Sequence, residues 1–256
     1  MSSKIKVDTI ENVAGSGNVS LGSGHNLVVP GTLAITGAST LTGAVTANGG
    51  VTLGGTTPTL TIGDAGAEDS KILFDGNAQD FHIGLDDSAD SLTIGLGSAL
   101  GTTSHMVIDA NGHITKPLQS AFCVTKSSDQ TNIAVASEVT VTFDTERFDQ
   151  NADFASNTFT APVTGKYQLS ATVGLTTIDD ASAYYYVNIL TSNTTYRTIF
   201  DPDFGQDNAY FPIIVSAVAD MDANDTAIIQ VAQAGGTQQT DVQAGTYTRF
   251  SGCLLA

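Results

Sequence analysis

Between residues 31 and 55 the polar and apolar positions follow a six-residue repeat. Glycine recurs at Gly31, Gly37, Gly43, Gly49 and Gly55. The apolar positions between these glycines are Leu33, Ile35, Leu41, Val45, Val51 and Leu53. Even spacing within a repeat is the period of a β-strand, and glycine permits a turn or a close approach of chains. The pattern predicts a β-structured repeat over residues 31–63.

Such a repeat cannot bury enough apolar surface by itself. Burial contributes roughly 25 cal/mol per Å², whereas ordering the backbone costs roughly 1 kcal/mol or more per residue. Repeats of this kind become stable by stacking on neighbours or on other chains. We therefore expect the six apolar residues to face an axis shared by several chains, and the alternative is a flexible Gly/Ser/Thr linker.

The pattern changes to short strands with polar turns over residues 64–117. Strands are expected at residues 71–75, 81–85 and 91–96, with residues 86–90 connecting the last two. Asn111 and Gly112 predict a second hairpin, because this dipeptide supports positive φ at a tight turn. Hairpins of this size are expected to need partners in order to fold.

Residues 118–256 carry longer strand patterns and no convincing helix. The expected strands are 121–125, 138–143, 158–161, 166–175, 184–190, 196–199, 210–219, 226–234 and 245–255. Many short strands in one segment favour an antiparallel sandwich or jelly roll. The chain is therefore expected to be all-β, with divisions at 1–30, 31–63, 64–117 and 118–256.

Charge excludes some classes of function. The chain has 256 residues, with 26 acidic and 9 basic side chains and a formal net charge of -17. This charge repels phosphate backbones, so we expect no nucleic-acid partner. No apolar stretch reaches the length of about 18 residues that spans a bilayer, so we expect no membrane insertion. The first residues lack the apolar run of a secretory signal, which predicts synthesis in a cytoplasm.

The sequence carries little catalytic chemistry. It has no nucleophile elbow, P-loop, dinucleotide-binding glycine motif or H-E-x-x-H motif, and its four histidines share no ligand spacing. We expect a protein that is not an enzyme and has no cofactor. Oxygen-rich loops suit Ca²⁺, and the weak calcium candidates are Asp201, Asp203, Asp207, Asp220, Asp222 and Asp225. Solvated turn aspartates are the favoured alternative.

Residues 143–174 resemble the signature of the C1q/TNF-like domain, with matching positions at Phe159, Pro162, Gly165 and Tyr167. Residues 225–231 and 248–255 resemble the last two strands of that family. Asn224 departs from the glycine that the family has there. The resemblance covers about half of the chain and implies a trimeric jelly-roll head.

Two further expectations concern the strands of this head. The resemblance implies that Cys123 and Cys253 lie in neighbouring first and last strands. In a bacterial cytoplasm we expect them to be reduced, buried thiols, with a late disulfide as the alternative. Among Tyr184, Tyr185 and Tyr186, the middle side chain is expected to face outward or into a subunit interface, and its neighbours to face the core.

The first half, from KIKVDTIENVAGSGNVSLGSGHNLVVPGTL to DFHIGLDDSADSLTIGLGS, resembles fibre proteins of marine, cyanophage-like tailed phages. The resemblance implies a homotrimeric structural fibre of the virion, assembled in a host bacterial cytoplasm. Residues 1–30 would attach to other virion proteins, and the head would bind a host cell-surface receptor or glycan. A tail fibre is expected. The alternatives are a capsid head fibre or decoration protein, and a tailspike that degrades polysaccharide.

Receptor contact is expected in loops, because loops on a rigid scaffold carry recognition. Two polar loops are predicted at residues 201–208 and 235–243. The contact candidates are Asp201, Phe204, Gln206, Asn208, Gln238 and Gln239.

Overall fold

The computed structural model describes residues 26–256, so most of the expected attachment segment, residues 1–30, lies outside the described residues. The chain divides into two units, Met1–Leu60 and Thr61–Ala256, which are described separately. Strands dominate the second unit, and its only helix among the described residues is the single turn η1 (Asp87–Ala89). No helix within residues 26–256 is long and apolar enough to cross a membrane.

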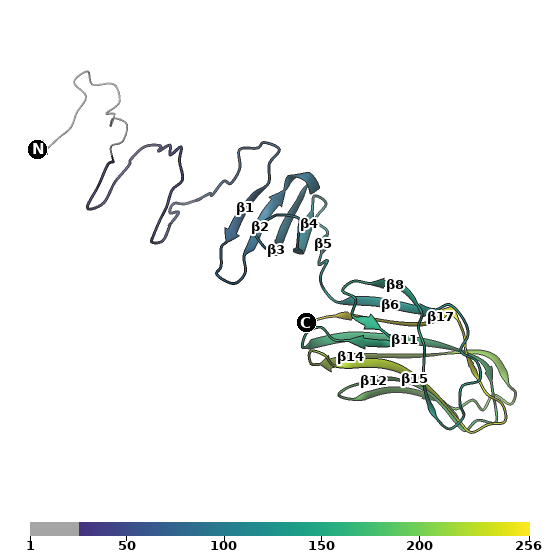
Figure 1. Ribbon diagram of the computed structural model, residues 1–256. Helices are drawn as coiled ribbons and strands as arrows, with labels where there is room; N and C mark the ends of the chain where they lie inside the picture. The colour runs from purple at the N-terminus through teal and green to yellow at the C-terminus, as the bar shows by residue number, and fades with distance from the viewer. Residues whose placement is uncertain (1–25) are drawn as a thin grey trace, which may run out of the picture. The chain divides into compact units, whose positions relative to one another are not determined.

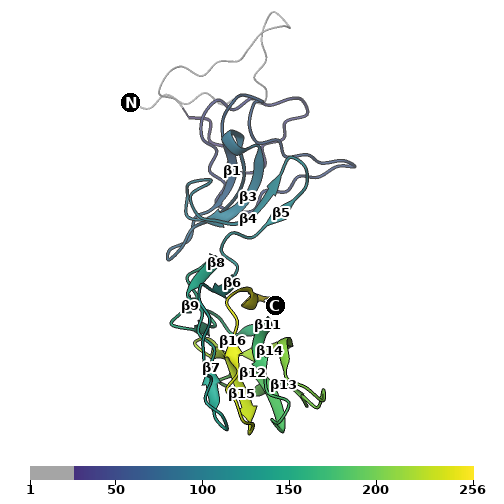
Figure 2. The same ribbon diagram turned by 90° about the vertical axis from the view of Figure 1, so that its right-hand side faces the viewer.

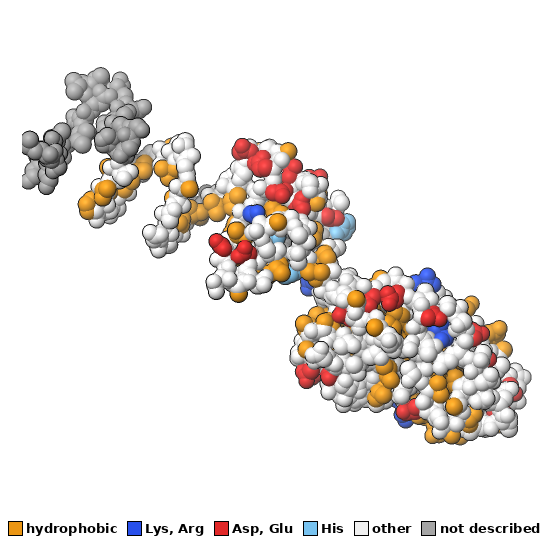
Figure 3. Space-filling model, viewed as in Figure 1, with side chains coloured by type: hydrophobic (Ala, Val, Ile, Leu, Met, Phe, Trp, Pro, Cys, Tyr) orange, Lys and Arg blue, Asp and Glu red, His pale blue; other side chains and the backbone are white. Residues whose placement is uncertain are grey.

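The glycine repeat is extended and forms no strand in the single chain, since the first described strand begins at Ser70. The six apolar residues predicted to face an axis are all more than half exposed, and Figure 3 shows hydrophobic side chains on the surface of this segment. A Cβ atom added at Gly31, Gly37, Gly43 or Gly49 would meet no atom within 4 Å. The β-structure predicted over residues 31–63 is therefore not formed in the described part of the single chain, because no backbone within residues 26–256 pairs with this segment.

Residues 70–115 form a five-stranded antiparallel meander (Figure 1). Its strands are β1 (Ser70–Phe74), β2 (Phe81–Asp86), β3 (Ser91–Leu96), β4 (Ser104–Asp109) and β5 (Ile114–Thr115), in that order. The three predicted strands and both predicted hairpins are confirmed. At the second hairpin Gly112 alone takes positive φ, at 84°, and the Asp109 carboxylate accepts the N–H groups of Asn111 and His113.

The head contains two further antiparallel sheets. The first has the order β14-β11-β17-β6-β8, with β16 paired to β11. Its strands are β6 (Ala121–Lys126), β8 (Thr145–Asp149), β11 (Gly165–Ile178), β14 (Asn208–Met221), β16 (Asp241–Val242) and β17 (Gly245–Leu254). The second has the order β13-β12-β15-β10-β9, with β7 paired to β15. Its strands are β7 (Glu138–Thr140), β9 (Phe154–Ala155), β10 (Thr158–Thr160), β12 (Tyr184–Thr191), β13 (Thr195–Phe200) and β15 (Thr226–Ala234).

The two sheets of the head lie face to face and enclose one hydrophobic core (Figures 1 and 2). The first strand, β6, pairs with the last, β17, and most sheet neighbours are distant in sequence. Two packed antiparallel sheets with these long-range pairings are a jelly roll. The predicted all-β class and the jelly-roll head are confirmed.

Aromatic stacking holds the middle of the core. The ring of Phe122 lies 4.7 Å from Phe159, 5.4 Å from Phe154 and 4.9 Å from Phe250. All four side chains are at most 5% exposed, and they come from both sheets. The cluster therefore joins the two layers.

The segment Phe159 to Tyr167, which carries the four matching positions of the C1q/TNF-like signature, forms the corner that leads into β11. The Tyr167 ring packs 5.4 Å from Phe159, and its hydroxyl donates a hydrogen bond to the Val163 carbonyl at 2.7 Å. At Gly165 a Cβ atom would lie 2.6 Å from the Ala256 carbonyl oxygen. The residue that departs from the family pattern, Asn224, takes φ of 73°, a left-handed conformation that asparagine tolerates.

Two expectations about side chains are wrong. Tyr185, the middle tyrosine, is fully buried, whereas Tyr184 is exposed, because the core phase of β12 is set by Val187 and Ile189. Cys123 and Cys253 lie in the paired strands β6 and β17, as expected, but they are only half-buried. Their neighbours Phe122, Val124 and Phe250 take the core-facing positions, so the two free thiols lie on the outer face of the sheet, in diagonal register.

The sequence also missed strands. β8 lies in a segment where no strand was expected, and β16 lies in the expected polar loop at 235–243. The strand expected at 138–143 ends at Thr140. These elements are short and pair at sheet margins, where a run of alternating residues is too brief to be recognised.

Replacing Phe122 by alanine tests the aromatic cluster. Removing a buried phenylalanine should lower the free energy of unfolding of the head by about 3–5 kcal/mol, through lost burial and the cavity left behind. Ile199, which is 54% exposed, provides the control Ile199→Ala, with an expected change below about 0.5 kcal/mol. Denaturant unfolding monitored by circular dichroism would measure both, and equal midpoints would contradict the role of the cluster.

Candidate functional site

Three loops meet at one end of the head. They are residues 179–183 after β11, residues 201–207 before β14, and residues 235–240 after β15; together we call them the distal loop cluster. The chain enters the head at Ala121, which pairs with Cys253 near the carboxyl terminus. At the same end, the backbone N–H of Lys166 donates a hydrogen bond to the Ala256 carbonyl. The distal loop cluster therefore lies at the end of the sandwich away from both points (Figure 1).

Asp179 fixes the loop 235–240 to the end of β11. Its side chain is 1% exposed and accepts N–H groups from Thr237, from Gln238 at 2.8 Å and from Ala181 at 2.9 Å. Burial raises the pKa of this carboxyl group, but the hydrogen bonds from Gln238, Ala181 and Thr237 outweigh burial, so the pKa lies below its usual value. Asp179 is thus a buried carboxylate held in its ionised form by backbone donors.

Two neighbouring carboxylates connect the loop 201–207 to the rest of the cluster. Asp180 accepts the N–H groups of Phe204 at 2.8 Å and Gly205 at 2.9 Å. Asp207 accepts the N–H of Asp180 at 2.8 Å and the side-chain amide of Gln238 at 3.1 Å. The three loops therefore form one hydrogen-bonded unit.

Buried polar side chains support the loops from below. The Tyr185 hydroxyl lies 2.8 Å from the Thr240 hydroxyl and accepts the N–H of Asp179 at 3.0 Å. The Gln233 amide donates to the Ser182 hydroxyl at 3.0 Å and to the Gln238 carbonyl at 2.7 Å. A satisfied buried network of this kind makes the loop conformation rigid.

The structure brings all six predicted contact residues to this end of the head. Phe204 packs 5.7 Å from Phe211 and remains 44% exposed, so it is an anchored aromatic side chain on the surface. Gln239 donates to the Asn132 and Ile133 carbonyls at 3.3 and 3.1 Å. The remaining candidates, Asp201, Gln206, Gln238 and Asn208, lie in the loops or at the first position of β14. Contact with a receptor stays a prediction.

Sequence reasoning missed the residues that hold this cluster together, Asp179, Asp180, Tyr185 and Gln233. Asp179 and Asp180 directly follow a long apolar strand pattern. Aspartate at such a position is typical of a turn, because its side chain can accept backbone N–H groups. Gln233 gave no signal, because its role depends on a turn that brings residues 235 to 240 back over its own strand.

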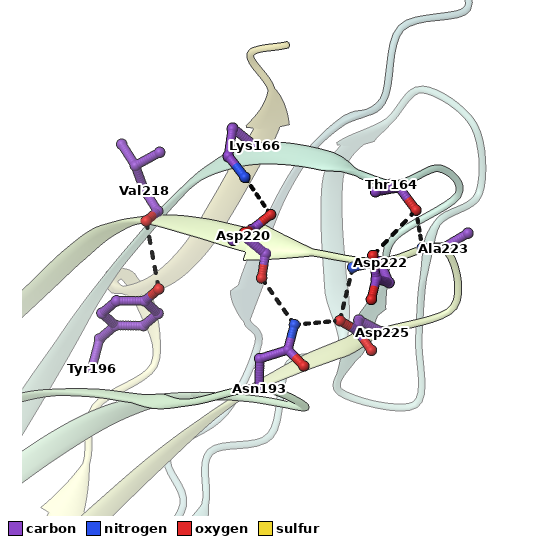
Figure 4. Close-up of polar contacts among 9 residues, drawn as sticks. All are labelled: Thr164, Lys166, Asn193, Tyr196, Val218, Asp220, Asp222, Ala223 and Asp225. Atoms are coloured by element: carbon purple, nitrogen blue, oxygen red, sulfur yellow. Dashed lines mark hydrogen bonds and ion pairs between the residues drawn. The ribbon is translucent and has the colours of Figure 1, made fainter.

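The aspartates of residues 220–225 lie at the other end of the head, Asp220 at the end of β14 and Asp222 and Asp225 in the turn that leads to β15 (Figure 4). Asp220 forms an ion pair with Lys166, and Asn193 donates to the Asp220 carbonyl at 3.0 Å and to the Asp225 carboxylate at 2.7 Å. That carboxylate also accepts the N–H of Asp222 at 2.8 Å. The carboxylates at Asp220 and Asp225 thus have partners within the protein that close the turn.

The calcium candidates therefore fall into two sets at opposite ends of the head. In the other set, Asp201 accepts the N–H of Asp203 at 3.2 Å, and Asp207 binds Asp180 and Gln238 as described above. Within residues 26–256 no three or more His, Cys, Asp or Glu side chains are placed together to hold a metal ion. The arrangement matches turn aspartates that accept hydrogen bonds from the protein.

Comparison with known proteins identifies no relative by sequence: no protein-family model matches the chain, and no curated protein matches it. Among solved structures, the globular domain of zebrafish complement 1qA is similar to 54% of this chain over 98% of its own length, with 17% identity and a TM-score of 0.39. Two crystal structures of murine APRIL, at pH 8.5 and pH 8.0, are similar over 54% of this chain and 99% of their own length, with 12% identity and TM-scores of 0.39 and 0.40.

The variant Asp179→Asn tests the loop anchor. The amide must point an NH₂ group at a backbone donor, which should lower the free energy of unfolding at pH 7 by about 1–3 kcal/mol. Because the folded pKa is lowered, the stabilisation by Asp179 is complete above the unfolded pKa of about 3.9 and is lost as the pH falls through the folded pKa. The difference between wild type and variant should therefore shrink below about pH 4.

Denaturant titrations at pH 7, 5, 4 and 3 would measure this difference. Asp203→Asn, at an exposed aspartate of the same cluster, is the control and should leave stability unchanged at each pH. A difference between wild type and Asp179→Asn that stays constant across the series would contradict an ionised anchor.

Proposed function

We propose that the chain is a structural fibre protein of a tailed-phage virion, a homotrimer and not an enzyme, whose head attaches the virion to the host surface. The observation that supports this most strongly is the uncovered apolar face of the meander β1–β5. An apolar face that residues 26–256 leave exposed is explained by contact with partner copies.

That face is continuous across the meander. Ile72 pairs with Ile83, and Ile83 pairs with Ile94, so the three side chains form a row on one face. Parallel rows on the same face contain Phe74, Phe81, Leu85, Leu92, Leu96, Met106 and Ile108. Five of these ten residues, Ile72, Phe74, Phe81, Leu85 and Leu92, are over 40% exposed. A face of this size on a soluble chain marks an interaction surface.

The glycine repeat supports the same conclusion. Its apolar side chains are exposed, and among the described residues a Cβ atom added at any of its five glycines would meet no atom within 4 Å. Glycines that no contact within the chain requires are explained by the close approach of other chains. The repeat and the meander would then each contribute to a trimeric shaft.

A third apolar surface lies on the outer face of the head sheet that contains β14. The side chains of Tyr210, Ile214 and Val218 recur at every fourth position on one face of β14 and are all more than half exposed. Tyr210 and Ile214, together with Tyr247, border a groove of about 680 Å³. In the proposed trimer the heads would contact one another through this face.

The number three and the virion assignment rest on the resemblances of the sequence. With the chain entering at the opposite end of the head, the distal loop cluster would point away from the virion. Three heads would then present three equal sites, and weak contacts at each site would combine into useful avidity.

The meander face provides a test of the trimer. Wild type should have a native mass three times the chain mass of 26.3 kDa. Ile83→Asp would bury a carboxylate in each subunit at a cost of several kcal/mol, and should lower the melting temperature of the trimer or abolish assembly. Leu73→Asp is the matched control, because Leu73 lies on the adjacent strand and is similarly exposed but faces the opposite side.

Native mass spectrometry and thermal melting would measure the three proteins. Equal mass and melting temperature for wild type, Ile83→Asp and Leu73→Asp would contradict the proposed interface. A folded wild-type monomer at micromolar concentration would contradict the trimer.

The position on the virion separates the proposed function from its alternatives. Gold-labelled antibodies against residues 121–256, applied to virions that contain this chain, should label the tail. Label over the capsid would identify a head fibre or decoration protein. Release of reducing sugar from host envelope polysaccharide by the purified protein would identify a tailspike.

A further inference from the structure

A groove crosses the outer face of the second head sheet beside two tyrosines. Tyr184 and Tyr186 project from β12, and their partners across the sheet on β15 are Ala234 and Ala232. Because alanine is small, the tyrosine rings stand beside a hollow whose far wall includes Glu138 of β7. The volume is about 320 Å³, at the small end of the range for ligand sites. We call this the Tyr184–Tyr186 groove.

The aromatic wall of the groove is ordered. The rings of Tyr184 and Tyr186 lie 6.1 Å apart with an interplanar angle of 23°, so they stand nearly parallel. The guanidinium carbon of Arg197 lies 3.8 Å from the centre of the Tyr186 ring, a cation–π contact. Tyr184 is 41% exposed, so its ring is accessible to a ligand.

The polar wall is pre-organised around one carboxylate oxygen. Oε1 of Glu138 accepts hydrogen bonds from the Tyr186 hydroxyl at 2.9 Å, from Nδ2 of Asn188 at 3.2 Å and from Arg197 at 3.2 Å. Within residues 26–256 the second oxygen, Oε2, accepts none. Burial and then the hydrogen bond to Glu138 raise the pKa of the Tyr186 phenol, which keeps its hydroxyl a donor.

The charges in the groove favour a neutral ligand. Arg197 already neutralises Glu138, and its Nε also donates to Asn188 at 2.8 Å, so the pair offers little to a free cation. The net charge of -17 on the chain repels anions. A flat aromatic surface next to a free acceptor suits a molecule with one apolar face and a rim of hydroxyl groups.

We propose that the Tyr184–Tyr186 groove binds one neutral pyranose ring of a surface glycan. The C–H face of the sugar would lie against Tyr184, and a sugar hydroxyl would donate to Oε2 of Glu138. This deepens the proposed function and rests on it, since it names the class of molecule that the head would bind on a host.

The groove would stay open in the proposed trimer. It lies on the sheet of β12 and β15, whereas the apolar outer face of β14 belongs to the opposite sheet. Gly235 lines the groove and also belongs to the distal loop cluster, so the groove lies at the end of the head that would face the host. Three copies would present three equal binding sites to a glycan-rich surface.

Saturation-transfer NMR on the full chain would test the groove, with the methyl glycosides of glucose, galactose, mannose and N-acetylglucosamine as probes. Wild type should transfer saturation to at least one of the four. Tyr184→Phe keeps the ring and should bind as wild type does, whereas Tyr184→Ala should weaken binding at least about tenfold. Glu138→Gln should also weaken it. Ile199→Ala, on the same sheet face but on the far side of the tyrosines, is the control and should bind normally.

Absence of transfer to all four glycosides would overturn the inference, and so would equal binding by wild type and Tyr184→Ala when native mass and circular dichroism show both to be folded. Adsorption of labelled protein to host cells tests the proposed function separately. If wild type and Tyr184→Ala adsorb equally, the groove fails while the fibre function stands. If the glycoside binding is lost in Tyr184→Ala but antibodies label no virion, the fibre function fails while the groove stands.

Discussion

Exposed apolar surface that the chain cannot cover by itself is the constraint on which the rest of this structure depends. The row of Ile72, Ile83 and Ile94 spans three strands of the meander β1–β5. Ile72 and Ile83 in this row remain exposed. The glycine repeat that precedes the meander in sequence has exposed apolar residues and no strand partner among residues 26–256. In the proposed trimer, both segments would gain the free energy of burial from other copies of the chain. The head differs, because its two sheets enclose a core of their own.

The head is therefore stabilised by its own residues. In the head, the stacked rings around Phe122 join the two sheets, and the corner at Tyr167 leads the chain into β11. The rigid sandwich then holds the distal loop cluster at one end through buried groups such as Asp179. Because anchoring uses carboxylates and amides within the protein, the exposed side chains of the loops remain available for recognition.

The two outer faces of the head have different chemistry. The face with Ile214 is apolar and suits contact between copies, whereas the face with Tyr186 combines aromatic rings, a carboxylate and a guanidinium. A trimer built through the first face leaves the second exposed three times. Assembly and recognition would thus use opposite sheets of the head, so a substitution such as Tyr184→Ala would leave the assembly face unchanged.

The sequence by itself determined the strands with long alternating patterns, such as 226–234, because burial of one sheet face imposes a period of two. The sequence also predicted that the glycine repeat over residues 31–63 has no core of its own, because too few apolar residues lie between its glycines. Only the tertiary structure decided that Tyr185 is buried, since the phase of a strand depends on which face meets the opposite sheet. It also decided that Asp179, Gln233 and Gln238 meet, because hydrogen bonds between loops distant in sequence leave no periodic signal. For the same reason the groove beside Tyr184 became visible only when β15 placed two alanines across from β12.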